Sequence, residues 1–293
     1  RQVRRESTGE FLAEGTVEGI HSCLCGILSD AVEAGYLTHN PAWRAYKKKG
    51  ITKERPVADE ETVQRLIAAL ETQSLKYEVY YKLILATGMR RGEACGLRWS
   101  DIDWRQRALH VRRNVVKLSR QPIMVKEPKT RAGVRVVYLS KDMCKLLRAW
   151  EKECQWEKEQ RGDEELTQDD YLFQQSNGDP MVPCTFTYRF KMILRENGLP
   201  DDLNVHSLRH TNASMLIAQG VDVRTVAGLL GHAQPSTTLD RFSRLRQKQA
   251  PRRPEAQRSD RAVKRWCFEP LDSTSGWVRE RWPQAIIETI GML

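Results

Sequence analysis

From Pro56 to Leu230 the apolar residues recur at helical spacing in every long segment but one, which limits the fold more than any other feature. The exception lies in the middle, where 107–118 and 134–139 are β-branched, alternating and separated by turn-forming residues. The pattern predicts a mainly α domain with a small antiparallel β-sheet, an α+β fold. The expected helices span 59–70, 77–86, 141–159, 186–196, 207–219 and 222–230.

The two ends of the chain differ in composition from this domain. A helix is expected from Thr16 to a stop at Gly35, and a polar, basic linker follows. The apolar stretch Trp277–Leu293 comes after a basic arm, and it can fold back on its own core or dock on a neighbouring copy. Because the first residue is not Met, we expect further sequence upstream. The expected domains are 1–43, 44–55, 56–250 and 251–293.

The charge of the chain favours a polyanionic partner. There are 48 Lys and Arg against 38 Asp and Glu, a net charge of +10. Two blocks, 105–135 and 243–265, hold ten and nine basic residues with only one and two acids, which is typical of a surface that binds nucleic-acid phosphates. No apolar run approaches membrane-spanning length, and the seven scattered cysteines predict reduced thiols, so we expect no membrane segment and a cytoplasmic location.

Five side chains that can bind an oxyanion or transfer a proton fall at or near the ends of expected elements. Two arginines around one phosphate can bind its non-bridging oxygens and stabilise a five-coordinate transition state. Lysine and histidine can exchange protons with the attacking and leaving oxygens. We expect the first arginine near the start of a short helix after Gly88, and the second in the first turn of a later helix. The five residues are Arg90, Lys129, His206, Arg209 and His232.

Other chemistries fit the sequence poorly. His206 and His210 have the spacing of a zinc-protease motif, but Ser207 stands where the catalytic Glu belongs and Arg209 would bring a cation near the metal. The chain contains no phosphate-binding Walker loop, and no carboxylate cluster suggests a two-metal nuclease. We therefore expect no metal and no cofactor.

Four segments, in this order, resemble the motifs of the tyrosine recombinases, the phage integrase family, as found in integrases of phages and transposon-like elements. They are TGMRRGEACGLRWSDID (Thr87–Asp103), KTRAGVRVVYL (Lys129–Leu139), HSLRH (His206–His210), and LLGH followed by STTLDRF (Leu229–His232 and Ser236–Phe242). Residues 16–41 resemble the end of the family's helical core-binding domain. The resemblance implies a catalytic domain in 56–250, preceded by part of a core-binding domain.

The resemblance also implies roles. Arg90 and Arg209 would clamp the scissile phosphate, Lys129 would protonate the leaving 5′ oxygen, His206 would act as general acid/base, and His232 would bind the phosphate. Glu93 would support Arg90. The partners implied are duplex DNA, further copies of the chain (dimer to tetramer) and DNA-bending accessory proteins. The remaining residues expected to contact DNA are Arg91, Arg112, Arg113, Lys126 and Arg131.

The sequence departs from the family at the nucleophile. Members cut DNA with a tyrosine, form a 3′-phosphotyrosyl bond and exchange strands through a Holliday junction, but this chain has Phe242 at that position. Phenylalanine has no hydroxyl, and no tyrosine follows Tyr188. We expect DNA binding without cleavage. Either a Tyr→Phe change was made deliberately, which we favour because the other five positions are complete, or the chain is a natural inactive paralogue.

Two rival hypotheses remain open. Residues 209–232 have a helix-turn-helix pattern, which would suit a non-enzymatic regulator or architectural DNA-binding protein. That hypothesis leaves the Arg90 and Lys129 motifs unexplained. A relaxing topoisomerase shares the phosphotyrosyl chemistry, but the Asn40-Pro41 boundary, the linker and the LLGH motif favour a recombinase.

Overall fold

The computed structural model describes residues 9, 11–45, 57–127, 133–163 and 165–231. The chain divides into two compact units, Arg1–Glu54 and Arg55–Leu293, which we treat separately. Within the described ranges no helix is long and apolar enough to cross a membrane. The residues Lys129, Arg131, His232 and Phe242, the linker residues 46–55 and the segment 251–293 lie outside the description.

The first unit is built around one helix, α1 (Glu14–Glu33). It begins two residues before the expected start at Thr16, and it is followed by Gly35 at a φ of 77°. The chain then folds back on the helix through Asn40, whose side-chain amide donates to Cys25 O and Ser29 Oγ, both at 2.8 Å. The residues after Gly35 are thereby held against α1.

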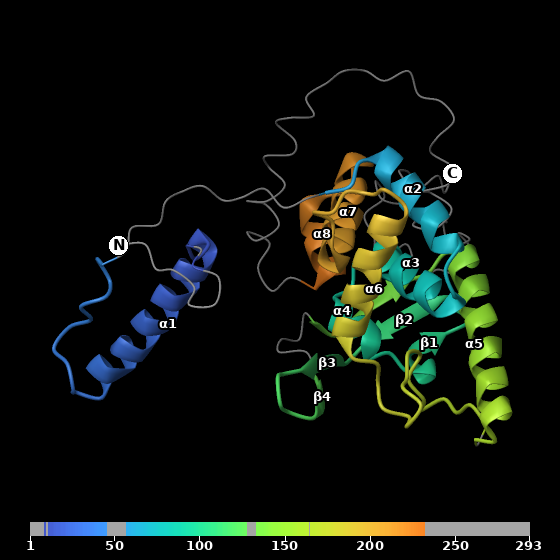
Figure 1. Cartoon of the computed structure of the whole chain (residues 1–293), viewed down its shortest axis with the longest axis horizontal. Coiled ribbons are helices and arrows are strands. Elements are labelled where there is room, and N and C mark those ends of the chain that lie inside the picture. Colours follow the sequence, from blue (N-terminus) through green and yellow to red (C-terminus); the bar gives the residue numbers. More distant parts are fainter. Residues whose placement is uncertain (1–8, 10, 46–56, 128–132, 164, 232–293) are drawn as a thin grey trace. The chain divides into compact units, whose positions relative to one another are not determined.

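The second unit contains the six helices expected from the periodicity, all of which are confirmed (Figure 1). The central helix is α3, in which every residue from Val79 to Leu85 is buried. The charged member of this run, Lys82, forms ion pairs with Glu71 and Glu78. A short additional helix, α4, follows α3. The bounds are α2 Glu60–Glu71, α3 Leu75–Thr87, α4 Arg91–Cys95, α5 Lys141–Arg161, α6 Pro183–Glu196, α7 Val205–Ala218 and α8 Val223–Leu230.

Two small antiparallel sheets confirm the predicted fold class, but the prediction of one strand over 107–118 was wrong. That segment forms two strands in different sheets, because the chain turns at Arg112 and Arg113. Arg113 is held there by a 2.7 Å ion pair with the buried Asp101. One sheet has the order β1-β2-β5 (Ile102–Asp103, Ala108–Val111, Arg135–Tyr138); the other is a hairpin of β3 (Asn114–Lys117) and β4 (Ile123–Lys126), which the sequence analysis missed.

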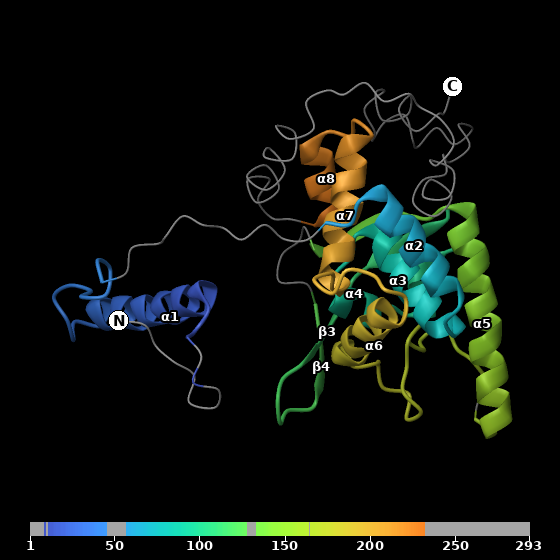
Figure 2. The ribbon, with the colours of Figure 1, turned by 45° about the horizontal axis from the view of Figure 1, so that its top comes forward.

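The hairpin and the helix ends gather around α4. Gly92 of α4 packs so tightly on β3 that a Cβ there would lie 2.5 Å from Val115 O. In both views α5 lies on the side of the unit away from α8 (Figures 1 and 2). One side of the unit is formed where the ends of α3 and α8 meet the first turns of α7. Helix α5 lies on the other side.

Candidate active site

Three arginines from different parts of the chain donate to three successive carbonyls at the end of α8. Arg135 Nε bonds Leu229 O at 2.8 Å, Arg209 Nη2 bonds Leu230 O at 2.6 Å, and Arg90 Nη2 approaches Gly231 O at 3.4 Å. The last carbonyls of a helix have no partner within the helix and form the negative end of its dipole. The end of α8 therefore brings these guanidinium groups together.

Arg209 is the most deeply placed of the three, with 1% of its surface exposed. Its Nη1 donates to Gly88 O at 2.7 Å, so one guanidinium joins the ends of α3 and α8. The prediction that Arg209 sits in the first turn of its helix was wrong. Asn204 caps α7 by accepting from the backbone N–H groups of His206 and Ser207, so the helix begins at Val205 and Arg209 falls in the second turn.

Gly88 allows this close approach. It ends α3 at a φ of 64°, in a left-handed conformation that favours glycine, and the short helix expected after it is α4. A Cβ on Gly88 would lie 2.5 Å from Leu230 Cδ2 and 2.7 Å from Asn212 Oδ1. Asn212 in turn donates to Leu85 O and Ala86 O. Helices α3, α7 and α8 therefore contact one another at a point that has no room for a side chain.

Glu93 lies beneath the arginines, with 3% of its side chain exposed. One carboxylate oxygen accepts from Arg90 Nη1 at 2.7 Å; the other accepts from Arg90 N and Arg135 Nη2, both at 2.8 Å. Burial acts to raise the pKa of Glu93, but the hydrogen bonds and charges of Arg135 and Arg90 outweigh it and hold that pKa below its ordinary value. The carboxylate is ionised at neutral pH, and it touches Arg90 as the sequence analysis expected.

Arg135 is a residue that the sequence analysis missed. Its side chain is 7% exposed and joins Glu93 to Leu229 of α8. One signal could have found it: Arg135 and Val137 share the inward face of β5, so the strand places a charged residue where alternation calls for an apolar one. A buried cation of this kind requires a partner.

The two histidines of α7 lie together. His206 is exposed, His210 is buried, and their rings meet edge to face with centroids 4.7 Å apart. The described residues contain no group of three His, Cys, Asp or Glu side chains that could hold a metal ion. Along α7, His206 comes one helical turn before Arg209.

The sequence from 56 to 249 matches the model of the phage integrase family. The chain belongs to the phage integrase family. It is 29% identical over 234 residues to the ICEBs1 integrase of Bacillus subtilis and 27% identical over 250 residues to a XerC-like tyrosine recombinase of Caldanaerobacter subterraneus. Each match covers 80% of this chain but only 62% and 63% of the relative, so the chain spans less than two thirds of either protein.

Solved structures show the same fold. The Tn1549 transposon integrase, in a tyrosine-to-phenylalanine variant in complex with transposon right end DNA, matches with a TM-score of 0.68 at 19% identity, over 81% of this chain and 79% of that one. XerA recombinase matches with a TM-score of 0.51 at 22% identity, over 76% and 72%.

The other described basic residues that were expected to contact DNA differ in exposure and in pairing. Arg91 is exposed and donates to Thr187 Oγ1, while Lys126 is exposed at the end of β4, in register with Asn114. Arg112 is exposed and lies 3.9 Å from Asp101. Arg113, in the connection between β2 and β3, instead forms an ion pair with Asp101.

Proposed function

We propose that this chain is the DNA-processing part of a site-specific recombinase or integrase, carrying Phe242 where the family has its nucleophilic tyrosine. The observation that carries the proposal is the pairing of Arg90 and Arg209 on the adjacent carbonyls of Gly231 and Leu230. Two guanidinium groups in that relation can bind two non-bridging oxygens of one phosphate. Membership of the phage integrase family makes a DNA phosphate the natural substrate.

The two arginines would contribute differently. Arg209 makes two short bonds to backbone carbonyls and is buried, so its position is fixed before DNA arrives. Arg90 is 41% exposed and its bond to Gly231 O is long, so it can exchange this carbonyl for a phosphate oxygen at little cost. The ionised Glu93 would keep Arg90 oriented throughout. Such preorganised charge stabilises the transition state without reorganisation.

The remaining roles follow from the family motifs. Lys129 would protonate the leaving 5′ oxygen, His206 would act in general acid/base catalysis and His232 would hydrogen-bond the phosphate. With a tyrosine at 242, cleavage would give a 3′-phosphotyrosyl link, and a 5′-hydroxyl from a partner duplex would then attack it by way of a Holliday junction. With Phe242 the chain would bind and align DNA without cutting it.

The assembly proposed is a dimer to tetramer on duplex recombination sites, in the bacterial cytoplasm. Residues 1–43 would form the end of a core-binding domain, 44–55 a linker and 56–250 the catalytic domain, and the segment 251–293 would dock in trans. The Tn1549 integrase supports the DNA partner, because its structure holds transposon right end DNA.

The test compares the chain with its Phe242→Tyr variant. Each is incubated with duplex DNA from the ends of the element and run on a denaturing gel. We expect a covalent protein–DNA adduct from the tyrosine variant alone. Tight binding with no adduct from either protein would contradict the proposal and favour the rival function, an inactive DNA-binding regulator or architectural paralogue.

A further inference from the structure

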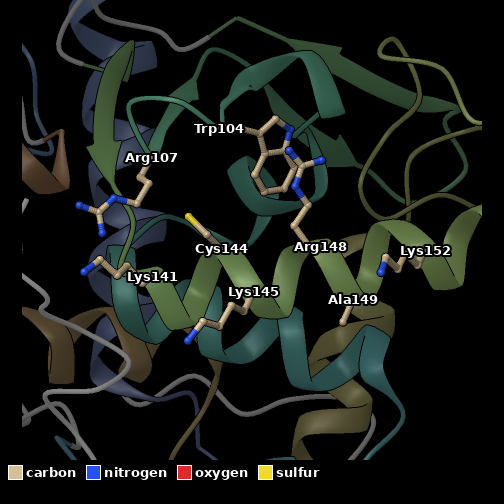
Figure 3. A pocket seen from close by; sticks show the side chains of 8 residues that line it. All are labelled: Trp104, Arg107, Lys141, Cys144, Lys145, Arg148, Ala149 and Lys152. Carbon is tan, nitrogen blue, oxygen red and sulfur yellow. The ribbon is translucent and has the colours of Figure 1, made fainter.

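A groove of about 490 Å³ runs along α5 (Figure 3). Helix α5 lies on the side of the second unit away from α8 (Figure 1). Five of its eight lining residues are basic and none is acidic. The basic residues are Arg107, Lys141, Lys145, Arg148 and Lys152. Like charges gathered in one groove repel one another and attract an anion.

The groove has an ordered cationic floor. The guanidinium of Arg148 lies over the ring of Trp104 at 3.6 Å, and Figure 3 shows the two groups stacked. Asp142 and Glu151 pair with Lys145 and Arg148. Two acids against five basic side chains leave the groove positive.

Arg107 has a backbone conformation that its own side chain disfavours. Its φ is +50°, in the left-handed region that glycine adopts without strain and arginine rarely does. It ends the turn between β1 and β2, and its carbonyl accepts from Leu139 N at 2.7 Å. A glycine would meet this backbone requirement without strain, so the position can accept an Arg→Gly change.

The side chain of Arg107 is also incompletely paired. Its Nη1 is buried and has no hydrogen-bond partner within the described part of the chain. A buried donor without a partner is costly, so the described part of the chain does not fully compensate this guanidinium.

We propose that this groove binds the phosphate backbone of a nucleic acid, at a surface separate from the candidate active site. Arg107 precedes Ala108, which pairs with Tyr138, whereas Arg135 pairs with Val111 at the opposite end of the same ladder. From Lys141 to Lys152 the basic side chains follow about 16 Å of helix, which equals the rise of about five base pairs along the axis of a duplex. A row of this kind suits a polynucleotide better than a single phosphate ion.

The half-buried thiol of Cys144, which lines the groove, can report occupancy. The full chain is alkylated with iodoacetamide at pH 8.5, since burial raises the pKa of Cys144, and the rate at each cysteine is followed by peptide mass spectrometry. A titration with duplex DNA should slow alkylation of Cys144 to about a third of its starting rate when free DNA reaches twice the dissociation constant of the groove, because about two thirds of the grooves are then filled. Inorganic phosphate at the same phosphate concentration should not.

Arg107→Gly is the decisive variant, because it removes the guanidinium and relieves the backbone strain together. We expect it to fold and to lose the protection of Cys144. Arg120→Gly makes the same change at the other described arginine with positive φ, +60°, outside the groove, and should keep the protection. Equal protection in Arg107→Gly and the unchanged chain would overturn the proposal. So would equal protection by free phosphate.

The outcome is separable from that of the proposed function. Arg90→Ala should leave Cys144 protected, and loss of protection there would show that the groove is not a separate surface. DNA binding measured by fluorescence anisotropy, without protection of Cys144, would refute the groove alone. Failure to bind duplex DNA at all would refute both proposals.

Discussion

The coupling between Arg135 and Glu93 offers the sharpest test of how the site is held together. In Arg135→Ala, the buried Glu93 carboxylate keeps only Arg90, a half-exposed partner, and Leu229 O loses its donor. Removing one partner of a buried ion pair costs about 3–5 kcal/mol, because the other charge stays buried and uncompensated. We expect the free energy of unfolding in urea, followed by near-UV circular dichroism, to fall by an amount in that range.

A double-mutant cycle identifies the cause. Glu93→Gln in the Arg135→Ala background removes the stranded charge, so the double variant should be more stable than the sum of the single losses by about 1–3 kcal/mol. The control cycle uses Arg161→Ala and Asp163→Asn, an exposed pair at 2.7 Å whose coupling should lie below about 1 kcal/mol. Additive losses at Arg135 and Glu93, or a coupling no larger than that of the control, would refute the reasoning.

Three further predictions concern packing, pH and salt. In thermal unfolding, Gly88→Ala should lose about 1–2 kcal/mol of stability because its backbone is left-handed, and about 1–3 kcal/mol more because the new Cβ overpacks against Leu230. The control Gly162→Ala, with a φ of +70° and open space around it, should lose only the first amount. Because the pKa of Glu93 is lowered in the fold, its contribution to stability is present above its unfolded pKa of about 4.3 and is lost as the pH falls through the folded value. Urea titrations from pH 6 to 3 should therefore show that the free energy of unfolding of Glu93→Gln depends less on pH than that of the unchanged chain. The same pH dependence in both proteins would contradict this prediction. The logarithm of the DNA association constant should fall with the logarithm of salt concentration by about 0.9 for each phosphate contacted, and a flat anisotropy response would count against phosphate binding.

The sequence predicted the helices well because their apolar spacing is local information. It also predicted a short helix after Gly88, the residue that ends α3, for the same reason. The break between β2 and β3 could not be predicted, since it depends on Arg113 meeting Asp101 across a turn. The start of α7 was misplaced because Asn204 caps the helix ahead of its apolar pattern.

The site shows the same division. The motifs named Arg90, Arg209 and Glu93, but the carbonyls at the end of α8 that orient the arginines belong to no side-chain pattern. Arg135 was one of many arginines in a basic block until the fold placed it between Glu93 and Leu229. Backbone acceptors and buried pairs of distant residues arise only once the helices are packed.

The central claim is that Arg90 and Arg209 hold a DNA phosphate for attack, and one measurement tests it most directly. In a Phe242→Tyr background, Arg90→Ala is compared with its neighbour Arg91→Ala, at DNA concentrations that saturate binding by anisotropy. The rate of covalent adduct formation is then measured on denaturing gels. Arg91→Ala should form the adduct at close to the parent rate, because its side chain turns to Thr187. Arg90→Ala should lose at least about a hundredfold, the scale seen when one transition-state donor is removed. Equal rates for the two variants would contradict the account.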